Sequence, residues 1–544
     1  MTTTTSLAGR REWAGLMVLV LPTLLVSMDI SVFFFALPRL TEDLAPSATQ
    51  LLWIMDVYGF LLAGFLVTMG ALGDRIGRRK LLLIGAAVFG VASAVAAFTD
   101  NASMLIVMRA AMGVGAAVLA PSTLALIRNM FHDDKQRTSA IGVWNAGFAA
   151  GGVLGPIVGG LLLERFWWGS VFLINVPVML LLLAVGPILL PEYRDPQPGP
   201  FDVLSAALTL ASILPIVFGI KDFANDGVGI SSVVPVVVGI GVGFLFVRRQ
   251  TGQRGILDLK LFKHSAFSAS LAANTLVMFI MLGLALFMSQ YLQLVKGLGP
   301  FVAALWSLPA VAATMIGVGI ASALVATIRP SRIVAGGLVL VAVGFTVITR
   351  VEADSALAVI LVGSAVMSIG IGMVSTVGTD LVVTTAPPER AGAASALSET
   401  GNELGGALGI AVLGSIGAAV YRGQMEQYSV NGDLGAAGET LPGAVVVAAD
   451  QGGAAGVALL DHAYAAFVDG MQTVALTGVF ILLAAALLIG YFLRNVLPKT
   501  SGTTAVGAPD DPADASDASD ASDGSAEPSA SVVSPSRSAP DAGR

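Results

Sequence analysis

The sequence lacks cysteine and contains few charged residues. None of its 544 residues is cysteine, so disulfides and thiolate metal sites are excluded. Its three histidines, His132, His264 and His462, show no metal-ligand spacing, and we expect no zinc site. Charged residues make up 12% of the chain, against about 25% in a typical soluble domain. These shortages argue against a soluble globular protein.

Motifs that would indicate ATP hydrolysis or catalysis are also missing. The sequence contains no G-x-x-x-x-G-K-[ST] phosphate-binding loop, so ATP is not expected to power its activity. It shows no nucleophile–base or metal-ligand constellation, which makes an enzyme the least favoured class. We expect neither a cofactor nor a nucleic-acid partner.

The chain is instead rich in apolar sequence. Apolar residues make up 55% of it, and the mean hydropathy is +0.83. Runs of roughly 20 apolar residues cross a membrane as helices. Fourteen such runs start near residues 14, 50, 80, 103, 138, 169, 203, 231, 266, 301, 333, 356, 393 and 465. The predicted class is an all-α integral membrane protein with fourteen transmembrane helices.

Basic residues alternate between the connectors of these helices. Connectors on one side hold 22 of the 29 Lys and Arg residues. Those on the other side hold one each, namely Arg39, Arg165, Lys221, Lys296, Arg350 and Arg422. Positive charge is retained on the cytoplasmic side, so we expect a multi-pass protein of the inner (plasma) membrane with both termini in the cytoplasm. Arg109 belongs to neither set and lies within a span.

A glycine repeat predicts two six-helix halves plus two intervening helices. Glycines 147, 151, 152 and 155 recur at 401, 405, 406 and 409, each offset by 254 residues. Parallel six-helix repeats are a transporter plan with the substrate site between the halves, although small residues at helix contacts alone could produce the pattern. The expected parts are a cytoplasmic N-terminus (1–13), an N-terminal half (14–190), a linker with two helices (191–265) and a C-terminal half (266–495).

Two further segments differ in composition. The acidic segment 422–464 contains an apolar run at 443–449 and is expected to be an extracellular loop, with a short hairpin at the outer mouth as one option. The segment 496–544 carries an Asp-Ala-Ser repeat and too little apolar surface to pack. We expect it to be a disordered acidic cytoplasmic tail, which either solvates the protein or docks to a partner.

Two motifs combine glycine with charge or proline. The connector after the second span contains Gly70, Asp74, Arg75, Gly77 and Arg78. Asp74 can accept a hydrogen bond from Arg78 or from a helix N-terminus across the interface between halves, which would hold one conformation of the transporter closed. The alternative is that this connector is simply a cluster of positive charge that anchors it on the cytoplasmic side. In the fifth span, close helix approach and a bend are expected at Gly151, Gly155, Pro156, Gly159 and Gly160.

These motifs, with Met28-Asp29 to Pro38 in the first span and Arg109 to Gly115 in the fourth, resemble the major facilitator superfamily. The likeness covers about residues 12–495 and is greatest to fourteen-span drug:proton antiporters, the antiseptic and multidrug exporters of the QacA and SmvA kind. It implies a major facilitator fold, with efflux of lipophilic, quaternary ammonium-like cations by alternating access, driven by a proton gradient. The alternatives are another substrate class (a lipid, a host-made antibiotic, a neutral or anionic drug) and a non-transporting sensor or scaffold. We expect a monomer that contacts membrane lipids.

Acids inside the first two spans are candidate site residues. A carboxylate buried in lipid is costly and suggests an ion or substrate path. Asp29 is either a proton- or cation-binding group or a structural acid bonded to a neighbouring helix. Asp56 is either hydrated near the outer mouth or, as the resemblance implies, involved in cation recognition. Trp53 and Tyr58 suit the second role, because aromatic faces attract organic cations by ~0.5–2 kcal/mol.

The thirteenth span supplies a second acidic pair. Glu399 and Glu403 are four residues apart and share one helix face, where mutual repulsion lets one of them hold a proton more readily. Glu399 could instead be hydrated near the inner end. Arg109 needs a buried partner, for which Asp29 is a candidate; the resemblance ties Arg109 to proton movement, and a fixed ion pair is the alternative. Weaker candidates for lining the cavity are Gln290 and Gln293.

The tenth span departs from the pattern of the resembled exporters. Those associated with divalent cations carry an additional acid there, whereas this span reads Leu308-Pro-Ala-Val-Ala-Ala-Thr314-Met-Ile. We therefore expect dications with two charged heads to be handled poorly.

Overall fold

The computed structural model describes residues 7–194, 203–227, 229–250, 259–386, 391–428, 435–494 and 496. All regular elements in these ranges are helices, and fourteen are long and apolar enough to cross a membrane. The predicted all-α class and the number of spans are confirmed. A second unit, Thr500–Arg544, lies outside the described residues, as does the predicted tail 496–544 apart from Val496.

The first six spans are built from α1 (Arg10–Leu44), α2 (Ala48–Ile76), α3 (Arg78–Ala97), α4 (Ala102–Met130), α5 (Asp134–Arg165), and α6 with α7 (Ser170–Leu173 and Asn175–Leu189). Polar residues set where several of these helices begin. Ser47 accepts from the Gln50 N–H while the Gln50 side chain accepts from the Ser47 N–H, a reciprocal cap of α2. Asn101 and Asp133 cap α4 and α5.

Two helices, α8 (Val203–Asp226) and α9 (Ile230–Gln250), follow the first six spans. The remaining elements are η1 (Leu259–Lys263), α10 (Ser265–Gln290), η2 (Tyr291–Val295), α11 (Pro300–Leu324), α12 (Pro330–Ile348), α13 (Leu357–Thr385), α14 (Ala391–Tyr428), α15 (Ala436–Glu439), α16 (Leu441–Gln451) and α17 (Gly453–Phe492). The π-helical segment η2 continues α10 directly, so the two form one span.

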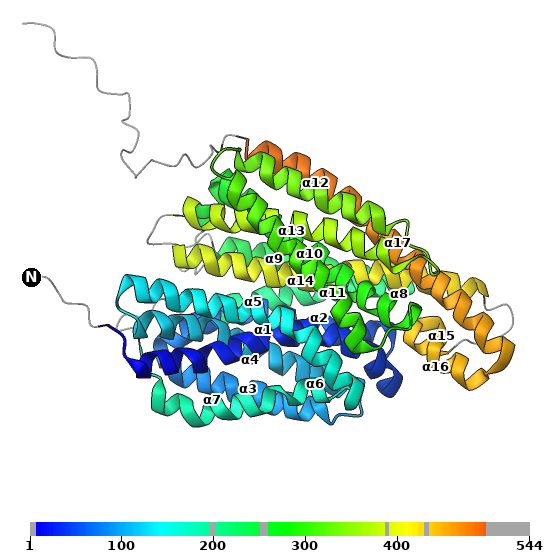
Figure 1. Cartoon of the computed structure of the whole chain (residues 1–544), viewed down its shortest axis with the longest axis horizontal. Helices are drawn as coiled ribbons and strands as arrows, with labels where there is room; N and C mark the ends of the chain where they lie inside the picture. Colours follow the sequence, from blue (N-terminus) through cyan, green and yellow to red (C-terminus); the bar gives the residue numbers. More distant parts are fainter. Residues whose placement is uncertain are drawn as a thin grey trace, which may run out of the picture. The chain divides into compact units, whose positions relative to one another are not determined.

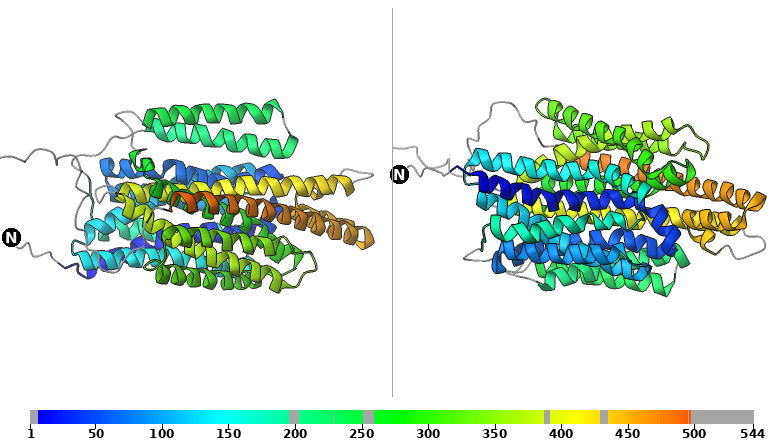
Figure 2. Two further views of the ribbon diagram at one scale, coloured as in Figure 1. Left: turned by 90° about the horizontal axis from the view of Figure 1, so that it is seen from above. Right: turned by 60° about the horizontal axis from the view of Figure 1, so that its bottom comes forward.

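The helices fall into two packed groups. In the first, α1 packs on α5, α2 on α4, and α3 on α4 and α7; in the second, α10 packs on α14, and α13 on α11 and α12. Figure 1 shows α1 to α7 together in blue to cyan, with α12, α13 and α17 on the opposite side of the bundle. The pair α8 and α9 pack mainly on each other, and Figure 2 shows them at the edge of the bundle.

Equivalent helices of the two groups meet through equivalent glycines. A Cβ added to Gly151 of α5 would strike the carbonyl oxygen of Leu24 in α1. A Cβ added to Gly405 of α14 would strike the carbonyl oxygen of Thr275 in α10. Only glycine permits these backbones to lie so close. Since residues 151 and 405 are one of the matched pairs in sequence, the repeated glycines make repeated contacts in space.

The bundle has two ends that differ in charge. We call the end at which α1 begins and α2 ends the basic end; it holds Arg10, Arg11 and residues 75–80. We call the opposite end the distal end. There the groups touch each other: the Ser289 hydroxyl of α10 donates to the Phe34 carbonyl of α1 at 2.7 Å, and Gly160 of α5 abuts the backbone of Phe301 in α11.

The segment 422–464, expected to be a loop, is largely helical. Helix α14 continues to Tyr428, α17 begins at Gly453, and α15 and α16 lie between them. The Tyr421 hydroxyl of α14 donates to the Ala437 carbonyl of α15 at 2.9 Å, and Thr440 caps α16. Tertiary contacts of this kind hold short helices whose local sequence alone is too weak to specify them.

Candidate functional site

The candidate site lies where both helix groups meet. A small cavity of about 30 Å³ is lined by α1, α2 and α4 from the first group and by α10 and α14 from the second. Its charged or aromatic lining residues are Phe33, Phe34, Asp56, Tyr58, Arg109 and Glu403. Four residues singled out in the sequence, on three different helices, are thus brought to one cavity.

Arg109 pairs with Asp29 inside the first group. Nη1 of Arg109 lies 2.6 Å from Oδ2 of Asp29, and the two side chains are 2% and 3% exposed. The Asn175 amide donates to the other carboxylate oxygen of Asp29 at 3.4 Å, and Nε of Arg109 donates to the Ile54 carbonyl at 3.3 Å. The partner considered for Arg109 from the sequence is therefore present, and each charge is compensated.

Aromatic rings complete the surroundings of Arg109. Its guanidinium carbon lies 4.6 Å from the centre of the Phe33 ring and 4.5 Å from that of Tyr58. Both distances are within the range of cation–π attraction. Tyr58, expected to face a substrate cation, thus faces a cation of the protein itself in this conformation.

Asp56 is completely buried, which rules out its being hydrated near the mouth. Its carboxylate is 0% exposed and lies 2.8 Å from Nζ of Lys221, a residue of α8 whose side chain is 1% exposed. Among the described residues, neither carboxylate oxygen has another hydrogen-bond partner. Lys221 is therefore the counter-charge of Asp56 through an ion pair.

Lys221 was placed in an outer connector by the sequence, and this placement is wrong. Helix α8 continues past it to Asp226, and the Nζ atom lies 3.9 Å from the centre of the Trp53 ring. Arg109 is consequently not the only cation buried among the described spans. One unused signal in the sequence could have shown this: the turn sequence Asn225-Asp226-Gly227 follows Lys221 by several residues and favours a later helix end.

The acids of α14 differ from those of the first group. Glu403 lines the cavity, and Glu399 lies one turn earlier on the same helix. Both side chains are partly exposed, and no basic side chain in the described ranges forms an ion pair with either one. Of the two acids that line the cavity, Asp56 is paired with an internal cation, whereas Glu403 has no ion-pair partner among the described residues.

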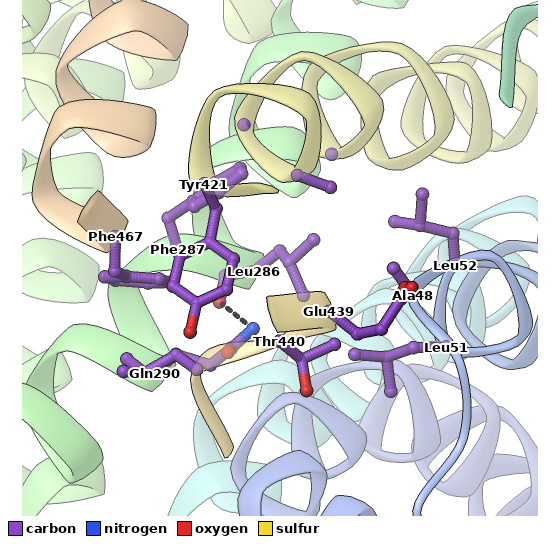
Figure 3. Close-up of a pocket in the computed structure, with 14 residues that line it drawn as sticks. Ala48, Leu51, Leu52, Leu286, Phe287, Gln290, Tyr421, Glu439, Thr440 and Phe467 are labelled. Atoms are coloured by element: carbon purple, nitrogen blue, oxygen red, sulfur yellow. Dashed lines mark hydrogen bonds between the residues drawn. The ribbon is translucent and has the colours of Figure 1, made fainter. Parts of the chain in front are cut away.

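The two glutamines predicted to line the cavity lie elsewhere. Gln290 borders a separate pocket near the distal end, beside Phe287, Tyr421 and Phe467, and its amide donates to the Leu286 carbonyl (Figure 3). Gln293 is buried in η2, with no hydrogen-bond partner for its Nε2 atom. Leu282 is the residue of α10 that reaches the cavity, whereas Gln290, at the end of α10, and Gln293, in η2, lie two or more turns further along the same span.

The charged motif after α2 forms a local cluster at the basic end. Arg78 donates from Nε to Oδ1 of Asp74 at 2.8 Å, the partner that the sequence suggested. Gly77 joins α2 to α3 with a φ of 110°, a backbone conformation that favours glycine. A residue missed by the sequence reading also takes part: Glu192 accepts from the backbone N–H groups of Arg79 and Lys80 at the start of α3.

The glycine–proline motif of α5 faces two helices. Gly151, Gly155 and Gly159 all lie against α1, and Gly160 lies against α11 of the other group. Pro156 stands inside α5 without ending it. The close approach predicted for this span is present, and one of its glycines lies at a contact between the two groups.

Comparison with known proteins identifies relatives over most of the chain. A family model described as Major Facilitator Superfamily matches residues 19–410. The "Multidrug efflux pump LfrA" of Mycolicibacterium smegmatis is 46% identical over 498 residues, covering 91% of this chain and 99% of that protein. The "Methyl viologen resistance protein SmvA" of Salmonella typhimurium is 34% identical over 406 residues, covering 74% of this chain and 82% of that protein.

Solved structures show the same fold at low sequence identity. A bacterial homologue of the human lysosomal transporter Spinster superposes with a TM-score of 0.64 at 18% identity, covering 90% of this chain and 98% of that one. The peptide transporter POT in complex with sulfate superposes with a TM-score of 0.58 at 17% identity, covering 88% and 95%.

Proposed function

Because this chain belongs to the Major Facilitator Superfamily, we propose that it exports lipophilic cations in exchange for protons by alternating access. It is a secondary transporter rather than an enzyme, and its fourteen apolar helices make it a multi-pass protein of the plasma membrane. The basic end is proposed to face the cytoplasm, with both termini, because positive charge is retained there. The exchange of ligands is proposed to occur in the cavity between the helix groups.

This proposal rests on the carboxylate of Glu403, which has no ion-pair partner among the described residues. Asp29 and Asp56 each have a buried internal cation within 3 Å, whereas Glu403 lines the cavity without one. A carboxylate in such surroundings needs a proton or a positive ligand. A cavity that holds one unpaired acid beside aromatic rings is suited to both.

Competition for Glu403 would couple the two fluxes. A bound cation neutralises the carboxylate and is stabilised by the rings of Phe33 and Tyr58 as well as by the apolar lining. A proton that binds Glu403 neutralises the same carboxylate. Because the carboxylate cannot hold a proton and a cation at the same time, binding of one ligand favours release of the other. Glu399, one turn away on α14, would take part by repelling the charge on Glu403.

The relatives support drug efflux as the biological role. One is a multidrug efflux pump and another is a methyl viologen resistance protein. The family match over residues 19–410 includes every residue that lines the cavity. By analogy, we propose that antiseptic quaternary ammonium compounds are among the substrates.

The test is dye-driven proton movement in everted membrane vesicles that contain the full-length protein. Ethidium or tetraphenylphosphonium should release protons from energised vesicles, whereas neutral and anionic compounds should not. Glu403→Gln should lower this response at least tenfold, while Glu426→Gln, an exposed acid on the same helix, should leave it unchanged. A full response from Glu403→Gln, or a response to neutral compounds only, would contradict the proposal.

A further inference from the structure

Lys221 enters the site from a helix that belongs to neither group. Helix α8 packs against α2 of the first group and α14 of the second, with Val217 buried against Phe60, Ala407 and Ala411. This apolar contact fixes the depth of α8 beside α2. It places Lys221, one turn beyond Val217 on α8, opposite Asp56.

The surroundings of the Lys221 ammonium match those of a bound organic cation. Its Nζ atom has a carboxylate oxygen of Asp56 at 2.8 Å and the centre of the Trp53 ring at 3.9 Å. A carboxylate and an aromatic face together are the groups that recognise ammonium ligands in proteins. Trp53 and Asp56 lie one turn apart on α2, so a single helix face supplies both.

Asp56 also borders the cavity between the groups. Its side chain contributes to the lining together with Tyr58, Gly59 and Glu403. In this conformation the carboxylate is fully buried against Lys221, so a cation in the cavity would reach it only as the ion pair with Lys221 opens. Asp56 carries one negative charge, which the two cations cannot both neutralise.

We propose that Lys221 is a tethered counter-cation that competes with the substrate for Asp56 and thereby sets which cations are exported. This inference rests on the proposed export of cations. To displace Lys221, a substrate cation must gain more free energy on binding than Lys221 gains from its ion pair with Asp56. Burial of the apolar surface of the cation supplies that difference. Bulky lipophilic cations meet the requirement, while small ammonium ions do not.

The first test is equilibrium binding of tetraphenylphosphonium and tetramethylammonium to the purified full-length protein. Lys221→Met keeps the length of the side chain and removes the competitor. It should lower the Kd for tetraphenylphosphonium about tenfold, equivalent to ~1.4 kcal/mol, and should permit measurable binding of tetramethylammonium. In an Asp56→Asn background the same change should have no effect, because the carboxylate for which both cations compete is absent.

A matched control is available in Lys296. Its Nζ atom lies 5.5 Å from the centre of the Tyr291 ring but donates to the carbonyls of Ala353 and Ser355, away from the cavity. Lys296→Met should leave both Kd values unchanged. If Lys221→Met folds and binds tetraphenylphosphonium no more tightly than the wild type, Lys221 merely clamps α8 to α2 and the inference is wrong. If the wild type binds no cation, the proposed function fails as well.

A second measurement needs no variant and so does not depend on whether Lys221→Met folds. Reductive methylation of lysines in the wild-type protein, followed by mass spectrometry, reports how accessible each ammonium group is. Lys221 should react slowly alone and several-fold faster with saturating tetraphenylphosphonium, while Lys296 should be unaffected. An unchanged or lower rate at Lys221 would overturn the displacement.

Discussion

Nη1 of Arg109 in α4 lies 2.6 Å from Oδ2 of Asp29 in α1, and both side chains are shielded from solvent. The pair lies next to the cavity that Arg109 helps to line. It joins two helices of the same group, so it would persist if the two groups move as rigid bodies in the proposed alternating access. A second buried pair, Lys221 with Asp56, instead joins α2 to α8.

Loss of the charge on Asp29 should abolish proton-driven export. Asp29→Asn leaves Arg109 buried without a counter-charge, and breaking a buried pair in this way costs ~3–5 kcal/mol. The variant should therefore also unfold at a lower temperature than the wild type in detergent. Vesicle proton flux and thermal unfolding of the purified protein measure the two effects.

A double variant separates stability from function at this pair. Asp29→Asn with Arg109→Met removes both charges and should recover much of the lost thermal stability. Export should nevertheless remain absent if the pair takes part in coupling. Full export by the double variant would show that the pair is a fixed structural element.

The packing of α5 on α1 should tolerate no side chain at Gly151. Its added Cβ would strike the backbone of Leu24, so Gly151→Ala forces the helices apart and should cost ~1–3 kcal/mol. Gly142, on the same helix, has nothing within 4 Å of an added Cβ, and Gly142→Ala should be neutral or slightly stabilising. Thermal unfolding of both variants is the measurement; equal melting temperatures would contradict the close contact.

Loss of the ion pair between Asp74 and Arg78 at the basic end should lower the export rate more than it lowers the melting temperature. Asp74 and Arg78 are 29% and 12% exposed, and exposed or part-exposed pairs contribute ~0–1 kcal/mol. Asp74→Asn should thus lower the export rate several-fold with little change in melting temperature, as expected if the pair helps to hold one conformation closed. Asp100→Asn, at an exposed acid between α3 and α4, is the control and should export normally.

Monocations should be exported better than matched dications. Thr314 and its neighbours in α11 supply no acid for a second charged head. Cells that express the protein should show several-fold greater resistance to a monocationic antiseptic than to its two-headed analogue. Equal resistance to both would remove the basis for this expectation.

The fold was predictable because its strongest signals are local. A run of about 20 apolar residues must form a helix in lipid, since no other partner exists there for its backbone groups. The same reasoning recovered all fourteen spans, and it identified Asp29, Asp56, Arg109 and Glu403 as charges within them. It left the structure of the segment 422–464 open, because α15 and α16 depend on contacts such as that from Tyr421 to Ala437.

The contacts within the candidate site could not be predicted from the periodicity of apolar residues. Arg109 was recognised as a cation that needs a buried partner, with Asp29 as a candidate, but only the packing of α4 on α1 shows that the two side chains meet. Gln290 was expected at the cavity, yet its position along α10 sends it to the distal pocket (Figure 3). Distances between helices far apart in sequence depend on side-chain packing, which a single sequence does not display.

The sequence by itself determined the membrane class, the number of spans and several of the charges inside them, among them Asp29, Asp56, Arg109 and Glu403 but not Lys221. It could do so because the cost of placing a charge or a free backbone group in lipid acts on each segment separately. Only the tertiary structure decided which of those charges neutralise one another. Lys221 shows the difference most clearly, since its single positive charge at the end of an apolar run is ordinary in sequence. Its importance comes from α8 packing beside α2, which brings its ammonium within 2.8 Å of Asp56 and leaves Glu403 as the unpaired acid of the cavity.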